Sequence, residues 1–265
     1  MIAVCIATYN HEAFIAQAIE SVLAQVCDEP LHIYIGDDAS TDGTQTVCER
    51  FAKKDDRIVY VRRKKNVGLV ANTIDLYRRI MVDGCEYIAM LDGDDYWTDP
   101  NKLQIQIDYL RNHPEVGFVH TGAFEERDGQ RCLVSDSNIP TGDLSLKYNC
   151  QGARQTNCSV LFRAGLLNNV NLEEIAKQNF PILDYPLYGL FAQYTQFAYL
   201  PSPTAVWRNH ISVSQPQGLK ASMHYRCERI RMWKWLNEQG DGHFHFRWYK
   251  AILWYIWQIF HILFA

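Results

Sequence analysis

The sequence predicts an α/β protein in which helices cover both faces of a Rossmann-like, mostly parallel β-sheet. The first 120 residues alternate between short apolar runs, typical of buried strands, and segments with apolar residues at helical spacing. Such alternation indicates a parallel sheet whose crossover helices pack on its two faces. Polar and acidic residues follow three of the apolar runs, so candidate ligand-binding groups are expected at the carboxyl edge of the sheet.

Strands and helices are expected in a regular order along this region. The apolar, branched runs predict strands at Ile2–Ala7, Leu31–Ile35, Ile58–Val61, Tyr87–Leu91 and Val116–Thr121. The periodic segments predict helices at residues 15–26, 44–52, 70–81 and 99–112. Asp99 and Pro100 are expected to begin the last of these as N-cap and first helical residue. Residues 125–149 are polar and turn-rich, which predicts a loop or hairpin, and residues 156–163 predict a further strand.

Composition and charge limit the classes of function. Hydrophobic residues make up 48% of the 265 residues and charged residues 21%, which allows a packed core and argues against global disorder. The net charge of −4, with acids and bases interleaved, argues against a nucleic-acid binder, which would need a basic face. The eight cysteines form no CxxC pair and are expected to be reduced, mostly structural thiols. The opening residues do not resemble a secretory signal, so a cytoplasmic location is expected.

The sharpest local pattern is an acidic cluster at the strand ends. Asp37 and Asp38 follow the second expected strand, and Asp92, Asp94 and Asp95 follow the fourth. Carboxylates gathered at one edge repel one another, and a bound divalent cation is the natural compensation. Hard oxygen ligands suit Mn²⁺ or Mg²⁺, which usually share their coordination shell with substrate phosphates. The structural alternative is a solvated acidic turn that caps the next helix.

Four motifs follow one another along the first half of the chain. They are Ala7–Asn10 (ATYN), Asp37–Thr44 (DDASTDGT), Asn66–Gly68 (NVG) with Asn72, and Leu91–Asp95 (LDGDD). In this order and spacing they resemble the signature of family 2 inverting glycosyltransferases, which have the GT-A fold. The resemblance is strong over about the first 120 residues and continues more weakly to about residue 215. It implies a catalytic domain at 1–218, with a nucleotide-sugar-binding half at 1–120 and an acceptor half at 121–218.

The resemblance also implies a donor site for a nucleotide-diphosphate sugar at the carboxyl edge. Thr8 and Tyr9 would line the base and ribose pocket, and one of Asp37 and Asp38 would accept a hydrogen bond from the base. The implied donor-binding residues are Thr8, Tyr9, Asn10, Asp37, Asp38, Asn66, Gly68, Asp92, Gly93 and Arg208. The implied ligands of Mn²⁺ or Mg²⁺ are Asp94, Asp95 and His210. For residues 66–68 a purely structural turn is the alternative.

The second half offers one candidate catalytic base. Asp184 lies in an apolar stretch at the position where the family has its base, commonly within a Glu-Asp pair; Leu183 replaces the first acid here. The structural alternative is that Asp184 caps a helix beginning at Pro186. Later in the chain, Arg208 and His210 resemble the family's Arg-x-His, which would contact a phosphate and complete the metal shell. The histidines interpreted as structural are His11, His32, His113 and His120.

The reaction that the resemblance implies is a single displacement with inversion at the anomeric carbon. Asp184 would remove the proton of the attacking hydroxyl, while the cation and Arg208 stabilise the departing nucleoside diphosphate. The expected donor is a UDP-sugar, and the expected acceptor is a glycan or lipid-linked molecule of cell-surface polysaccharide or glycolipid synthesis. The alternative is a non-catalytic nucleotide-sugar-binding protein. Nucleotidyltransferases and nicotinamide enzymes are excluded, because no glycine-rich loop follows the first strand.

Residues 219–265 predict a helical tail of distinct character. From Lys220 onward there are seven Lys or Arg against three Asp or Glu. The tryptophans interleaved with these basic residues are Trp233, Trp235, Trp248, Trp254 and Trp257. This pattern suits a helix on an anionic membrane surface, which would attach the protein peripherally to the inner face of the membrane. The alternative is that the tryptophans pack on the catalytic domain or on a sister subunit of a homodimer.

Overall fold

The computed structural model describes residues 1–134, 142–144, 156–209 and 218–239. The helices are α1 (Ile15–Leu23), α2 (Thr44–Ala52), α3 (Leu69–Val82), α4 (Lys102–Asn112), α6 (Leu172–Gln178), α7 (Asp184–Phe191) and α8 (Gly218–Gln239), with 3₁₀ turns η1 (Asn157–Ser159) and η2 (Ala164–Asn169). The strands are β1 (Ile2–Thr8), β2 (Leu31–Asp37), β3 (Ile58–Arg62), β4 (Tyr87–Asp92), β5 (Tyr96–Trp97), β6 (Val116–Arg127), β7 (Gln130–Val134), β8 (Gly142–Leu144), β9 (Val160–Arg163) and β10 (Gln196–Arg208).

One mixed sheet organises the chain, with strand order β3-β2-β1-β4-β9-β6-β10-β5. The first four strands in this order are parallel, as the alternation of strands and helices predicts. Strand β9 is antiparallel to both β4 and β6, and it joins the first half of the chain to the second. Strand β1 is buried along all of its residues, as expected of a central strand covered on both faces. The fold class predicted from the sequence is therefore confirmed.

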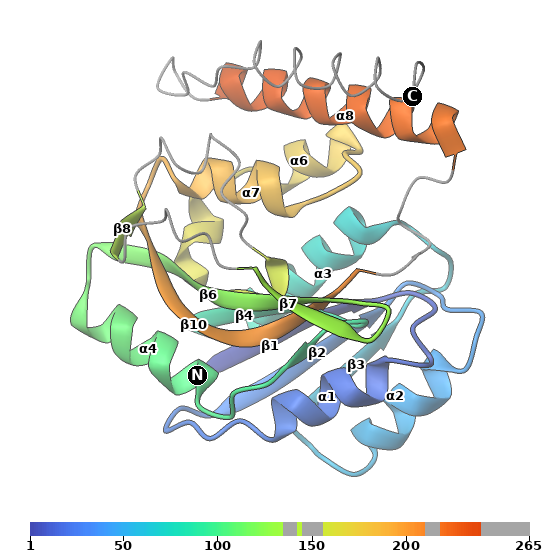
Figure 1. Ribbon diagram of the computed structural model, residues 1–265, viewed down its shortest axis with the longest axis vertical. Coiled ribbons are helices and arrows are strands. Elements are labelled where there is room, and N and C mark those ends of the chain that lie inside the picture. The colour runs from blue at the N-terminus through green and yellow to red at the C-terminus, as the bar shows by residue number, and fades with distance from the viewer. Residues whose placement is uncertain (135–141, 145–155, 210–217, 240–265) are drawn as a thin grey trace.

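Helices form a layer on each face of the sheet (Figure 1). Helices α1, α2 and α4 cover one face, where alternate β1 residues such as Val4 and Ile6 enter a buried apolar cluster. Helices α3, α6 and α7 cover the other face, where Ala3 and Cys5 enter a second cluster with residues of α3 and α7. Burial on both faces explains the continuous apolar run of β1, which a strand with one solvated face would not have.

Two local predictions differ from the structure in detail. Helix α4 begins at Lys102 with Asn101 as its N-cap, so the predicted start, with Asp99 as N-cap and Pro100 as first helical residue, is wrong by two residues. Asp99 instead accepts a hydrogen bond from the backbone N–H of Asn101 at 2.8 Å, in a turn that precedes the helix. The polar segment after residue 125 begins as a hairpin between β6 and β7, turned by Asp128 and Gly129, which both have positive φ.

The described part of the C-terminal tail packs on the catalytic domain. Helix α8 lies over α6 and α7 (Figure 1). The Trp233 ring meets Tyr185 at 5.4 Å between centroids, and the Trp235 ring meets Phe180 at the same separation, both edge to face. The packing alternative therefore holds for these two tryptophans, while residues 240–265 lie outside the described residues. None of the described helices is both long enough and apolar enough to span a bilayer.

Candidate active site

The ends of three parallel strands bring the predicted polar groups together. In the sheet register, Thr8 at the end of β1 pairs with Asp37 at the end of β2. On the other side, Ala7 pairs with Asp92 at the end of β4. The segments after these strands therefore share the carboxyl edge of the sheet, as predicted.

Gly93 lets the acidic loop approach the end of β1. Its N–H donates to the carbonyl oxygen of Ala7 at 2.9 Å. A Cβ at this position would lie 2.6 Å from Thr8 Oγ1 and 2.8 Å from His11 Nδ1. The same imidazole contacts Thr8 Oγ1 at 3.2 Å, and its Nε2 lies 3.7 Å from Asp94 Oδ2. His11 therefore belongs to the acidic edge, and its interpretation as a purely structural histidine missed this contact.

Tyr9 and Asn10 follow β1 on the same edge. Tyr9 is half-buried. Asn10 has a left-handed backbone with φ of 58°, and its Oδ1 accepts the backbone N–H of Thr41 at 2.7 Å, while its own N–H donates to Ser40 Oγ at 3.0 Å. Asn10 thus ties the loop after β1 to the loop after β2.

The two carboxylates after β2 are engaged by the protein. Asp37 is fully buried and accepts hydrogen bonds from Ser40 N–H at 2.8 Å and from the Tyr60 hydroxyl at 2.7 Å. Asp38 accepts the backbone N–H groups of Val67 at 2.7 Å and Gly68 at 2.8 Å. Asp37 therefore holds its own loop, whereas Asp38 holds the loop at residues 66–68.

The loop at residues 66–68 has the features of the structural turn. Gly68 has a φ of 87°, a conformation that favours glycine. Besides its bond to Asp38, the Gly68 N–H lies 3.2 Å from Asn66 Oδ1. These contacts explain both residues without a ligand, and they place the turn beside Asp38.

Asp92 and Asp95 face different surroundings although they share one loop. The Asn157 side-chain amide donates to both oxygens of Asp92, at 3.1 and 3.2 Å. Burial and the neighbouring Asp94 raise the pKa of Asp92 to about 7. Asp95 is buried, accepts the backbone N–H of Arg208 at 2.8 Å and receives a hydrogen bond from the Cys158 thiol. Burial, together with Asp94 and Asp92, raises the pKa of Asp95 well above its usual range.

Arg208, the last residue of β10, holds the acidic loop at residues 92–95 against the end of that strand. Its Nη1 donates to the backbone carbonyl of Asp94 at 2.6 Å, and its Nε lies 3.4 Å from Glu126 Oε1. The guanidinium carbon lies 4.4 Å from the Tyr96 ring centroid and 5.0 Å from that of Phe14. The sequence indicated Arg208 as a phosphate contact, but its guanidinium is engaged with the loop and with these two rings.

Asp184 lies in the first turn of α7. The helix begins at Asp184 and not at Pro186, its N-cap is Leu183, and no side chain caps it. Asp184 Oδ1 accepts the N–H of the adjacent residue, Tyr185, at 2.9 Å, which is one residue too close for a capping bond. Its carboxylate also faces the end of β4, where its charge raises the pKa of Asp92. Burial raises the pKa of Asp184, while the Tyr185 N–H and the Arg229 guanidinium on α8 act in the opposite direction. The alternative of a cap on a helix beginning at Pro186 is therefore wrong, and the role of Asp184 as base stays a prediction.

Comparison with known proteins identifies the family. The model of Glycosyl transferase family 2 matches residues 3–169. The chain belongs to this family. Relatives include Rv1520 of Mycobacterium tuberculosis, 33% identical over 210 residues that cover 77% of this chain and 57% of Rv1520. Another relative is the Escherichia coli UDP-Glc:alpha-D-GlcNAc-diphosphoundecaprenol beta-1,3-glucosyltransferase WfaP, 27% identical over 191 residues that cover 72% of this chain and 68% of WfaP. The chain thus spans only about half the length of Rv1520.

Solved structures share the GT-A fold of this chain. S. aureus TarS 1-349, in complex with UDP-GlcNAc, superposes with a TM-score of 0.65 at 15% identity, covering 91% of this chain and 67% of that one. The mannosyltransferase PcManGT of Pyrobaculum calidifontis, in complex with GDP-Man and Mn²⁺, gives a TM-score of 0.59 at 19% identity, covering 87% and 61%. At these identities the likeness shows a common fold, not a common substrate.

The acidic edge of this chain suits a divalent cation in part. Asp94 and Asp92 concentrate negative charge in a partly buried loop, and carboxylate oxygens are hard ligands. Within the described ranges, however, no three His, Cys, Asp or Glu side chains converge as a ready ligand set. His210, the third expected ligand, lies outside those ranges. The donor set therefore fits a cation that takes further ligands from substrate phosphates.

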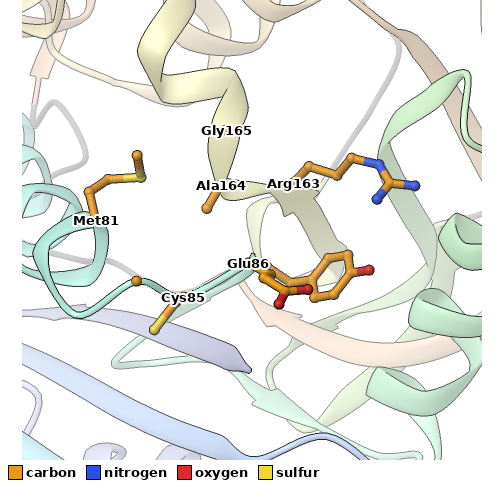
Figure 2. A pocket seen from close by; sticks show the side chains of 8 residues that line it. Met81, Cys85, Glu86, Arg163, Ala164 and Gly165 are labelled. Carbon is orange, nitrogen blue, oxygen red and sulfur yellow. The ribbon is translucent and has the colours of Figure 1, made fainter.

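A hollow of about 400 Å³ lies at the opposite edge of the sheet, where β4 begins (Figure 2). It is lined by Met81, Gly84, Cys85, Glu86, Tyr87, Arg163, Ala164 and Gly165. The guanidinium of Arg163 donates to the backbone carbonyls of Val116 at 3.1 Å and Leu110 at 2.6 Å, so it serves the fold. In a parallel sheet, ligands bind at the carboxyl ends of strands, and this hollow lies at the other end.

Proposed function

We propose that this protein transfers a sugar from a nucleotide-diphosphate donor, with a UDP-sugar as the expected donor, to an acceptor hydroxyl with inversion at the anomeric carbon. The observation that carries the proposal is the nearness of Asp184, the first residue of α7, to Asp92, the last residue of β4, whose pKa its charge raises. Asp94 follows Asp92 in the same acidic loop. A carboxylate for the donor and a carboxylate for the acceptor thus approach from different elements. The UDP-Glc donor of WfaP and the UDP-GlcNAc bound to TarS support this choice of donor.

In the proposed donor site, the nucleotide lies across the ends of β1 and β2. Thr8, Tyr9 and Asn10 line it, with Tyr9 available for stacking on the base. Each oxygen of Asp38 has a second lone pair beyond its bond to the loop at residues 66–68, so it can also accept from the base. Gly93 brings the backbone close to the sugar diphosphate.

The proposed metal is Mn²⁺ or Mg²⁺, with Asp94 as the protein carboxylate that holds it and His210 as the further ligand expected from the sequence. Asp95, engaged by Arg208 and Cys158, is assigned instead to holding the loop. When bound, the cation would offset the charge that develops on the leaving diphosphate. The structure of PcManGT with GDP-Man and Mn²⁺ supports the choice of cation.

Asp184 acts as the general base in the proposed mechanism. Its carboxylate takes the proton of the acceptor hydroxyl as the oxygen attacks the anomeric carbon, and the bond to the nucleoside diphosphate breaks on the opposite side. A single displacement of this kind inverts the configuration and needs no covalent enzyme intermediate. Arg208 contributes by fixing the loop that carries Asp94.

The proposed acceptor is a glycan or a lipid-linked glycan of cell-surface polysaccharide or glycolipid synthesis. The diphosphoundecaprenol-linked acceptor of WfaP supports this class. An acceptor of this kind sits in a membrane, so we also propose peripheral attachment through the basic, tryptophan-rich tail from about residue 223 to residue 265.

The test compares two aspartates that each accept a backbone N–H near the start of a helix. Asp184→Asn should retain donor binding and lower kcat by at least ~10²-fold, the usual loss for a general base. Asp99→Asn, which alters the turn before α4 and lies outside the acidic loop at residues 92–95, should keep wild-type kcat. Equal activity of the two variants would show that Asp184 is not the base. Wild-type protein that binds donor but transfers no sugar to any acceptor would favour the non-catalytic alternative.

A further inference from the structure

Asn157 has a fixed role between two parts of the site that the sequence did not connect. Its Nδ2 donates to the Asp92 carboxylate at 3.1 and 3.2 Å, and its Oδ1 accepts the hydroxyl proton of Tyr188 at 2.7 Å. Because a carboxylate only accepts, the amide nitrogen must face Asp92 and the amide oxygen must face Tyr188. The orientation of the amide is therefore determined by its partners.

Tyr188 shares its helix with the proposed base. It lies four residues after Asp184 on α7, a spacing that puts both side chains on the same face of a helix. Its ring is buried and packs edge to face on Phe118, with 4.8 Å between centroids. The packing fixes the ring, and the hydroxyl alone reaches Asn157. The hydrogen-bonded chain from Asp92 to Tyr188 thus spans from the end of β4 to α7.

The sequence places Asn157 where it can make this link. It begins the short 3₁₀ turn η1, directly before β9. Strand β9 pairs with β4, so the start of β9 lies beside the end of β4 and carries Asn157 to Asp92. The two residues after Asn157, Cys158 and Ser159, are fully buried, which anchors the turn.

We propose that Asn157 and Tyr188 are positioning residues that hold α7, and with it Asp184, at a set distance from Asp92. We call this pair the Asn157–Tyr188 brace. The inference rests on the proposed function, since it assigns the brace to the transfer step. A general base must lie within hydrogen-bond reach of the proton it removes, and small displacements of a reacting group cost large factors in rate. Linked hydrogen bonds also strengthen one another, so occupation of Asp92 and placement of α7 are coupled.

The first test removes one hydroxyl and leaves the packing. Tyr188→Phe should lower kcat by about 10- to 100-fold while KM for the donor changes less than about threefold, because Asp92 keeps its contact with Asn157. Tyr34→Phe is the matched control. Tyr34 is also buried, and its hydroxyl donates a hydrogen bond to Asp83 at 2.7 Å, outside the site. The Tyr34→Phe variant should therefore have the kcat of wild type. A Tyr188→Phe enzyme with wild-type kcat would overturn the brace.

The second test asks whether the two residues act as one unit. Asn157→Ala should lower kcat and also raise KM for the donor, because Asp92 loses its amide partner. The double variant with Tyr188→Phe should lose no more kcat than Asn157→Ala alone, since Tyr188 acts through Asn157. Losses that multiply instead would show independent roles and reject the brace.

Hydrogen exchange gives a readout that does not need the reaction. In the Tyr188→Phe and Asn157→Ala variants, the backbone amides of α7 should exchange faster than in wild type, while the amides of α4 should exchange at the wild-type rate. In the Tyr34→Phe control, the amides of both helices should exchange at the wild-type rate. Unchanged exchange in α7 would also overturn the brace. If wild-type protein transfers no sugar, the proposed function is wrong, and so is the part of the inference that concerns catalysis. Hydrogen exchange would then still test whether Asn157 and Tyr188 hold α7 in place.

Discussion

The contact between Gly93 and the end of β1 makes Gly93→Ala an informative substitution. The added methyl carbon would lie 2.6 Å from Thr8 Oγ1 and 2.8 Å from both Thr8 Cβ and His11 Nδ1. The Thr8 side chain is short and stands on the backbone of β1, so it cannot rotate its Cβ away. Either the strain remains in the fold, or the acidic loop moves away from β1.

The magnitude follows from the size of the overlap. Forcing one extra carbon into a packed site typically costs about 1–3 kcal/mol. Strain that stays in the fold would appear as lost stability, about 2–4 °C in Tm per kcal/mol for a chain near this size. Strain relieved by moving the loop would appear as lost donor affinity, by roughly 5- to 150-fold for 1–3 kcal/mol. The two losses together should amount to about 1–3 kcal/mol.

Thermal unfolding and titration with UDP in the presence of Mn²⁺ would measure both parts. Gly165→Ala is the control, because no atom lies within 4 Å of the added carbon there and the residue lines the hollow at the opposite edge. That variant should match wild type within about 0.5 kcal/mol in stability and should bind UDP with unchanged affinity. A Gly93→Ala protein with wild-type Tm and wild-type UDP affinity would refute the close contact and the place of the donor beside it.

Three further predictions follow from the second half of the chain. Arg229→Gln should raise the pKa of Asp184, because the Arg229 guanidinium lowers it. Since a base works deprotonated, the acid limb of the plot of kcat/KM against pH should move to higher pH, and a limb that does not move would contradict the prediction. Trp235→Ala should destabilise the fold by about 3–5 kcal/mol in a denaturant titration, whereas exposed Lys234→Ala should change it by under about 0.5 kcal/mol. The 265-residue protein should pellet with anionic liposomes, and less of it should pellet in high salt, because salt screens the attraction. A version without residues 240–265 should stay in solution, and if both versions pellet to the same extent the membrane proposal is wrong.

The parallel half of the fold could be predicted because its signals are local. A strand buried on both faces, such as β1, is a continuous apolar run, and the crossover helices show helical spacing. The carboxyl ends of parallel strands then necessarily meet, which puts Thr8, Asp37 and Asp92 at one edge without further information. The predicted start of α4 is two residues too early, because an Asp side chain accepts a backbone N–H in a turn as readily as at an N-cap.

The partners of these groups could not be read from the sequence, because they come from distant positions. Asn157 reaches Asp92 from 65 positions along the chain, and Arg208 reaches Asp95 from 113. Nothing in the local pattern of either segment marks these pairings, since they depend on β9 lying beside β4 and β10 ending near the acidic loop. His11 carried a weak local signal, since it directly follows the first motif at the end of β1.

Hydrogen bonding divides the acids at the carboxyl edge into two groups. Asp37 and Asp38 are buried and accept hydrogen bonds from backbone N–H groups, so the protein itself stabilises their charges. Asp95 also accepts a backbone N–H, that of Arg208, but burial and its acidic neighbours still raise its pKa well above the usual range. Asp94 and Asp184 are partly exposed, and the pKa of Asp92 is raised by burial and by the charges of both. Folding therefore gathers negative charge at one place and leaves part of it uncompensated by the surrounding backbone. A residue set of this kind favours a bound cation, which can in turn hold a diphosphate, and this is why we propose Asp92, Asp94 and Asp184 for the chemistry.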